Sequence, residues 1–130
     1  MATVETEVYD ILRAAGGVTS LCPATRIKPP GHNQNLAMPY IVHFPVAERP
    51  IRTHGGVAAL RIWESYQISV FSADYSTGRA LADAVRVAMD GVTATGVHVQ
   101  FQGLRQFAEG EEDEVNVNHF VLEFLIAEAV

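Results

Sequence analysis

The sequence has 130 residues, enough for one domain with its own hydrophobic core, and residues 1–130 are interpreted as a single domain. Its net charge of −6 argues against a free-standing nucleic-acid-binding protein, because such proteins usually need a basic face. The longest uncharged stretch, 29–47, contains too many prolines and polar residues to span a bilayer, and the acidic N-terminus does not resemble an export signal.

The first expected element is an amphipathic helix that ends at Gly16 and Gly17, with Thr3 as a possible cap. Its apolar face consists of residues spaced three and four apart: Val4, Val8, Ile11, Leu12 and Ala15. The segment 18–38 contains many prolines, glycines and asparagines, which predicts a long irregular connection. Cys22 lies in it and is interpreted as a small, partly buried residue.

A short strand is expected at 40–44, ended by Pro45, with Tyr40, Val42 and Phe44 on its buried face. The segment 45–59 is then expected to be a long, mobile and mostly basic loop. Its candidate contact residues for a partner are Arg49, Arg52, His54, Gly55 and Gly56.

The hydrophobic period changes once, between 60 and 91. Apolar residues at even positions from Leu60 to Val70 indicate a strand. From Thr77 onward the apolar residues lie three and four apart, which predicts a helix capped by Asp74 or Ser76 and ended by Gly91.

Two further strands are expected at 97–107 and 120–126, on either side of a run of acids. The order helix, strand, strand, helix, strand, strand predicts an α+β fold. We expect one four-stranded, mainly antiparallel sheet with both helices on one face. The acidic run is either a solvated loop or a surface that faces a partner, and consists of Glu109, Glu111, Glu112, Asp113 and Glu114.

One layer of helices leaves the other sheet face uncovered. Counting alternate positions, this face is expected to carry aromatic residues among neutral polar ones, which suits contact with another subunit. Alternatively, the long loops fold over it. The candidate contact residues are Trp63, Gln67, Phe71, His98 and Gln100, with Leu104 on the same face.

No catalytic, cofactor or metal site is expected. The five histidines lack the spacing of zinc ligands, and no nucleophile or phosphate-binding motif occurs. His43 and His98 are interpreted as surface or interface histidines. A pocket that holds His43 or His54 beside a carboxylate would instead favour a small enzyme or ligand-binding domain.

Three motifs follow the helix at YDILRAAGG in a fixed order: RIKP (26–29), PYIVHF (39–44) and RIWESYQISVFSADYSTGRALADAVRVAMDG (61–91). Taken together, these segments resemble the tail completion or tail terminator family of tailed bacteriophages. The resemblance covers about residues 8–91. It implies a non-enzymatic virion protein, assembled in the bacterial host cytoplasm, that forms a ring, usually a hexamer.

In that family the ring stops growth of the tail tube at its head-proximal end and joins the tail to the head connector. The implied partners are other copies, the tail tube protein and the head-completion protein, with DNA passing through the lumen without specific binding. A head-tail connector or stopper, or a tube subunit, is the neighbouring alternative.

Overall fold

The computed structural model describes residues 4–28, 38–52, 58–94, 97–109 and 117–129. Its helical elements are α1 (Val4–Ala14), α2 (Gly16–Thr19), a 3-10 turn η1 (Ala24–Arg26) and α3 (Tyr75–Met89). Its strands are β1 (Ile27–Lys28), β2 (Tyr40–Arg52), β3 (Ala58–Ser72), β4 (Thr93–Ala94), β5 (Val97–Glu109) and β6 (Val117–Ala129).

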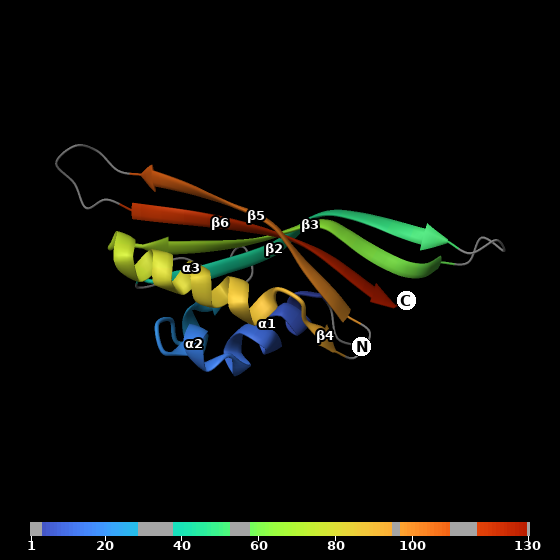
Figure 1. Ribbon diagram of the computed structural model, residues 1–130, viewed down its shortest axis with the longest axis horizontal. Helices are drawn as coiled ribbons and strands as arrows, with labels where there is room; N and C mark the ends of the chain where they lie inside the picture. The colour runs from blue at the N-terminus through green and yellow to red at the C-terminus, as the bar shows by residue number, and fades with distance from the viewer. Residues whose placement is uncertain (1–3, 29–37, 53–57, 95–96, 110–116, 130) are drawn as a thin grey trace.

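The described strands form one sheet of six, in the order β1-β2-β3-β6-β5-β4 (Figure 1). The four long strands pair antiparallel, as predicted, while β1 pairs with β2 in parallel. The expected sheet of four therefore gains a two-residue strand at each edge. The irregular connection expected at 18–38 contains β1 and η1, and α2 begins at Gly16, where the first helix was expected to end.

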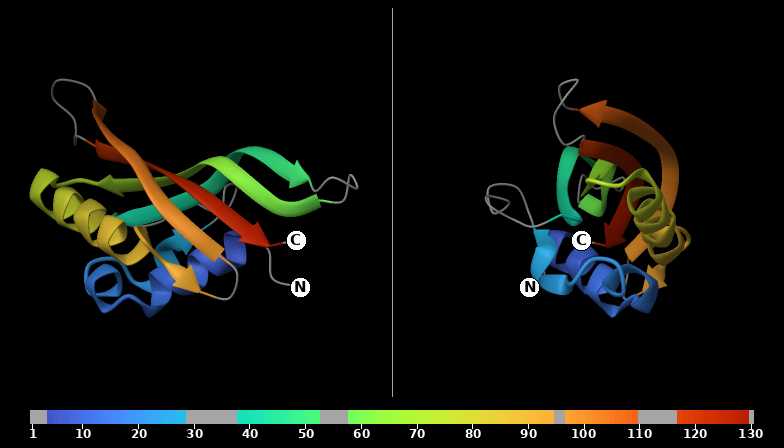
Figure 2. Two further views of the ribbon diagram at one scale, coloured as in Figure 1. Left: turned by 45° about the vertical axis from the view of Figure 1, so that its right-hand side comes forward. Right: turned by 90° about the vertical axis from the view of Figure 1, so that its left-hand side faces the viewer.

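All three α-helices lie on one side of the strongly twisted sheet (Figures 1 and 2). The core lies between the two layers, because the periodic apolar residues of α1 and α3 face the alternate apolar residues of β3 and β6. Its largest members with at most 1% exposure are Tyr66, Phe120, Phe124, Leu12, Ile27, Ile41, Ile68, Leu81, Met89, Leu122 and Ile126.

Helix α3 has the predicted boundaries. The Asp74 side chain accepts hydrogen bonds from the backbone N–H and the hydroxyl of Thr77, which caps the helix start. Gly91 follows with a φ of +77°, a conformation that glycine adopts without strain. Leu81, Val85 and Met89 are buried, as the spacing predicts.

Strand β2 differs from the expectation. It does not end at Pro45 but continues to Arg52, and it pairs with β3 up to Ala58. Pro45 lies next to a register shift in the pairing with β3, on a part of β2 that has a strand partner only on one side within the described residues, and proline is tolerated at such bulges and edges. The segment 45–59 is therefore mostly a hairpin arm rather than a loop, and Figures 1 and 2 show it extending beyond the helices.

The buried face of β2 also differs. Ile41 and His43 are 0% and 1% exposed and face the helices, whereas Tyr40 and Phe44 are half-buried on the opposite face. His43 is therefore a core residue, not the surface or interface histidine that was expected. The error arises because the polar imidazole was assigned to the exposed side, although a buried hydrogen-bond partner was available to it.

Two bulges shift the expected alternation of side chains. A bulge between Trp63 and Tyr66 pairs Trp63 with Ile126, a core position, while Phe71 pairs with His119 on the other face. A bulge between Phe101 and Gly103 pairs Leu104 with Leu122 and brings it against the core. Leu104 therefore does not share the face of Phe71, and the register at Trp63 departs from the expected alternation, because each added residue reverses it.

Candidate functional site

The sheet face turned away from the helices, here called the outer face, carries a row of four aromatic rings. Tyr40, Phe71, His119 and Phe107 occupy paired positions on β2, β3, β6 and β5. The ring centroids lie 4.8 Å apart for Tyr40 and Phe71, 4.1 Å for Phe71 and His119, and 5.9 Å for His119 and Phe107. Phe107, at the β5 end of the row, is 47% exposed.

Next to this row the outer face is already partly packed. Val42, Ser69 and Val121 are buried, although the α-helices lie on the opposite side of the sheet. Arg105 pairs with Glu123 at the β5 side of the row. The outer face thus has a packed centre and, beside it, the exposed ring of Phe107. The positively charged Arg105 and the negatively charged Glu123 lie on the same face.

The structure places four of the five predicted contact residues on the outer face, spread along β6 rather than in one cluster. Gln67 and Phe71 are paired with Glu123 and His119 of β6, and His98 and Gln100 with Ala127 and Leu125, all odd-numbered positions of the outer face. Trp63 is the exception, because of its bulge. The aromatic partners Tyr40, His119 and Phe107 were missed, since cross-strand neighbours follow from register and not from chain order.

The predicted basic residues lie on the hairpin arm. Arg49 pairs with Ile62 and Arg52 with Ala58 near the end of the arm, while His54, Gly55 and Gly56 lie outside the described residues. Of the acidic run, Glu109 is the last residue of β5 and pairs with Val117. The acids Glu111, Glu112, Asp113 and Glu114 lie outside the described residues.

The helical side of the molecule carries a second apolar surface, a groove of about 280 Å³ between the start of α2 and α3. Val87 lies at this groove and is 81% exposed, the largest exposed fraction among the large apolar side chains of the described residues. The signal was present in the sequence, since Val87 lies two residues from the buried Val85 and so on the opposite side of the helix. The lining residues are Ala15, Gly17, Asp83, Ala84, Val87 and Ala88.

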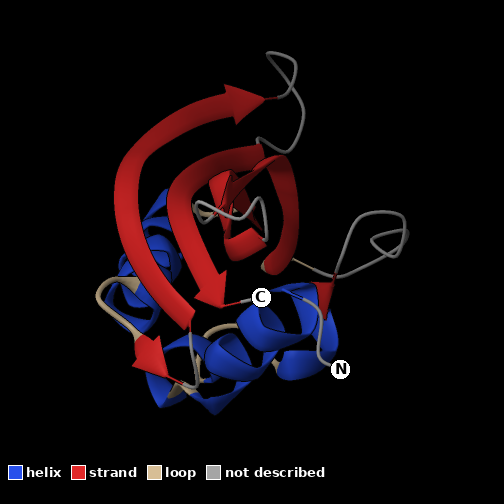
Figure 3. Ribbon diagram, turned by 90° about the vertical axis from the view of Figure 1, so that its right-hand side faces the viewer, coloured by secondary structure: helices blue, strands red, loops and turns tan. Residues whose placement is uncertain are grey.

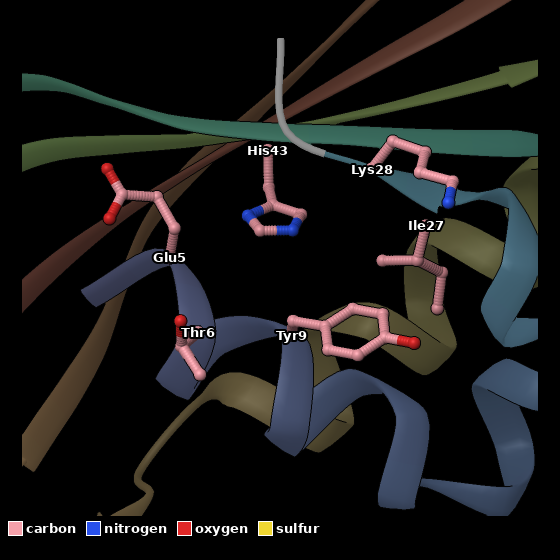
Figure 4. A pocket seen from close by; sticks show the side chains of 6 residues that line it. All are labelled: Glu5, Thr6, Tyr9, Ile27, Lys28 and His43. Carbon is pink, nitrogen blue, oxygen red and sulfur yellow. The ribbon is translucent and has the colours of Figure 1, made fainter. Parts of the chain in front are cut away.

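A separate cavity of about 250 Å³ lies between α1 and the β1 edge of the sheet. Figure 4 shows His43 pointing from β2 toward α1, with Glu5 on one side and Lys28 on the other. This is the arrangement, a histidine beside a carboxylate, that would favour a ligand-binding or catalytic pocket. The lining residues are Glu5, Thr6, Tyr9, Ile27, Lys28 and His43.

The electrostatics of this cavity do not suit a general base. Burial lowers the pKa of His43 to about 4, and the nearby Glu5 carboxylate opposes that shift only in part. His43 is therefore neutral at pH 7, and its Nδ1 lies 2.7 Å from the hydroxyl of Tyr66, whose pKa burial raises. The described residues that line the cavity include neither cysteine nor serine, and Cys22 is buried elsewhere with a pKa raised by burial to about 11.

Metal sites and membrane-spanning helices are both absent from the part of the chain that the structure describes. Among these residues, no group of three or more histidine, cysteine, aspartate or glutamate side chains could hold a metal ion. The longest described helix, α3, has 15 residues, and no described helix combines the length and apolar character needed to cross a membrane.

Comparison with known proteins identifies a family and a solved assembly. The model of a family described as tail completion protein gp17 matches residues 6–128. A chain from the virion of a native gene transfer agent particle has a TM-score of 0.68 and 25% sequence identity. The match covers 95% of this chain and 92% of that one. A search of curated proteins found no match.

Proposed function

The chain belongs to the tail completion protein gp17 family, and from that membership we propose that it forms a ring at the head-proximal end of the tail tube. In this proposal the ring is a hexamer that ends tube growth and joins the tail to the head connector. The broader role does not depend on the ring: the protein is a structural component of a phage-like tail, not an enzyme.

The observation that carries the ring proposal is the aromatic row of the outer face. Phe107 is 47% exposed, whereas Val42, Ser69 and Val121 of the same face are buried. A second subunit that covers this row would remove apolar surface from water, which favours association. We assign Gln67, Phe71, His98 and Gln100 to the same contact, because they share the face. Trp63 stays a candidate contact only at the arm.

The remaining contacts run along the axis of the ring. The hairpin arm with Arg49 and Arg52 would reach the tail tube, since β2 and β3 project beyond the helices in Figure 1. We assign His54, Gly55 and Gly56 to the same contact from their place in the sequence between these strands. The acids of 109–114 would face the connector or the lumen. Negative charge in the lumen would keep DNA phosphates from adhering during passage, without specific binding.

Solution mass and negative-stain imaging, with and without the tail tube protein, test this function. Closed rings that cap tubes and stop their elongation are expected. Long stacks would indicate a tube subunit instead, and rings that bind only the head side would indicate a connector or stopper. A monomer that ignores tubes would overturn the proposal.

A further inference from the structure

A ring of more than two identical subunits needs two different contact surfaces on each copy, because a rotation other than two-fold brings unlike surfaces together. The first surface of one copy contacts the second surface of its neighbour. The proposed function supplies only the first, the outer face. From the structure we infer that the second is the groove at Val87 on the helical side, and that it receives Phe107 of the neighbouring copy. This inference rests on the proposed ring.

The positions of the two surfaces fit that arrangement. Figure 3 shows the helices on one side of the sheet. Because Phe107 pairs with His119 on the outer face and the groove is formed by residues of the helical layer, the two surfaces belong to opposite layers of one subunit. Copies related by one repeated rotation can then pack sheet against helices around a closed circle. Two equivalent surfaces on one side would give only a dimer.

The chemistry of the two surfaces is complementary. Phe107 and Val87 are two of the four large apolar side chains that are exposed among the described residues. The groove beside Val87 is lined mainly by alanine and glycine, so an aromatic ring can enter it without displacing large side chains.

Charged side chains flank both surfaces. Asp83 lines the groove, pairs with Arg79 and has a side chain that is 55% exposed. Arg105 lies two residues before Phe107, and its side chain is 64% exposed despite its contact with Glu123. Each surface therefore presents one cation and one anion at its rim, which allows alternating pairs across the contact.

The test uses two charged substitutions, Val87→Lys and Phe107→Glu, in the full chain. Val87→Lys places a cation four residues after Asp83, a spacing at which opposite charges stabilise a helix. The same substitution puts a charge into the proposed apolar contact. The matched control is Tyr75→Glu, which changes a third exposed apolar residue (48%) at the first turn of α3, where a carboxylate is favourable.

We expect the wild type and Tyr75→Glu to have the mass of the ring, and each of the other variants alone to have the monomer mass. An equimolar mixture of Val87→Lys and Phe107→Glu should give a species of at least twice the monomer mass, because each variant keeps the surface that the other has lost and the two altered surfaces carry opposite charges. That recovery also shows that both variants are folded.

The other outcomes separate the two proposals. If the wild type forms rings and either variant keeps them, the contact between Phe107 and Val87 is wrong while the ring stands. If both variants dissociate but the mixture stays monomeric, the two surfaces do not bind each other. If the wild type itself is monomeric with and without the tail tube protein, the proposed ring fails, and this inference fails with it.

Discussion

The hydroxyl of Tyr66 and Nδ1 of His43 lie 2.7 Å apart inside the core, where the two residues are 0% and 1% exposed. We assign the phenol as the donor, because burial raises its pKa and its proton needs an acceptor. The bond joins neighbouring strands β2 and β3 at the helix-facing side of the sheet. It keeps a polar pair in the core at the point where the hairpin arm begins.

Acid should destabilise the protein through His43. Its pKa is about 4 in the folded protein against the ordinary histidine value of 6.5, so the unfolded chain binds more protons between these values. The contribution of His43 to the free energy of unfolding is therefore fully present above pH 6.5. It decreases by about 3 kcal/mol as the pH falls from 6.5 to 4. Urea unfolding at pH 7 and pH 4 measures this loss. The variant His43→Gln should show a smaller decrease, and an equal decrease would contradict the assignment.

Removing the phenol hydroxyl should cost stability without changing the shape of the core. Tyr66→Phe leaves Nδ1 of His43 buried without its donor, and we expect the free energy of unfolding to fall by about 1–3 kcal/mol. Tyr75→Phe is the control. Because that side chain is 48% exposed, its effect should stay within about 0.5 kcal/mol. If Tyr66→Phe and Tyr75→Phe lowered the free energy of unfolding by similar amounts, the buried hydrogen bond would contribute no more to stability than the exposed hydroxyl of Tyr75.

The packing of α3 on the sheet depends on Gly78. A Cβ atom at this position would lie 2.6 Å from Cε2 of Phe120 and 3.0 Å from Cβ of Ser72. Phe120 is 1% exposed and cannot move aside freely. Gly78→Ala should therefore destabilise the protein by about 1–3 kcal/mol, although alanine is the better helix former.

Gly16→Ala is the matched substitution in α2, since a Cβ there meets nothing within 4 Å. Thermal unfolding of the two variants should move in opposite directions or differ by several degrees, because alanine at an unobstructed helical position stabilises by up to about 1 kcal/mol. A neutral Gly78→Ala would mean that α3 and β6 are less closely packed than described.

Helix α3 and strand β6 were predictable because their signals are local. Periodic apolar residues from Leu81 to Met89, a cap at Asp74 and a glycine at 91 each follow from physical chemistry that acts within a few residues. Alternation from Phe120 to Ile126 likewise gave the buried face of β6. The family resemblance added the tail role, which no local pattern carries.

The faces of β2, β3 and β5 were not fully predictable, because they depend on register. Alternation identifies a face only while no residue is inserted. The bulge before Tyr66 has no distinctive sequence signal, whereas the bulge in β5 lies at Gly103, and a glycine inside a strand is a general but weak sign of a bulge. The burial of His43 depends on Tyr66, which is 23 positions away. The expected alternation holds at Phe71, where the register is regular, and is shifted at Trp63, while the contact itself stays a prediction.

The bulge in β5 can itself be tested with two neighbouring substitutions. If side chains alternated without interruption, Gln102 and Leu104 would share the outer face, and changing either to alanine would have a similarly small effect. The bulge instead pairs Leu104 with Leu122, and Leu104 packs against the core while Gln102 is exposed. Leu104→Ala should then lower the free energy of unfolding by about 1–2 kcal/mol, less than a fully buried leucine. Gln102→Ala should change it by no more than about 0.5 kcal/mol. Equal values from urea unfolding would mean that the alternation is unbroken, which would turn Phe107 toward the helices and remove it from the aromatic row.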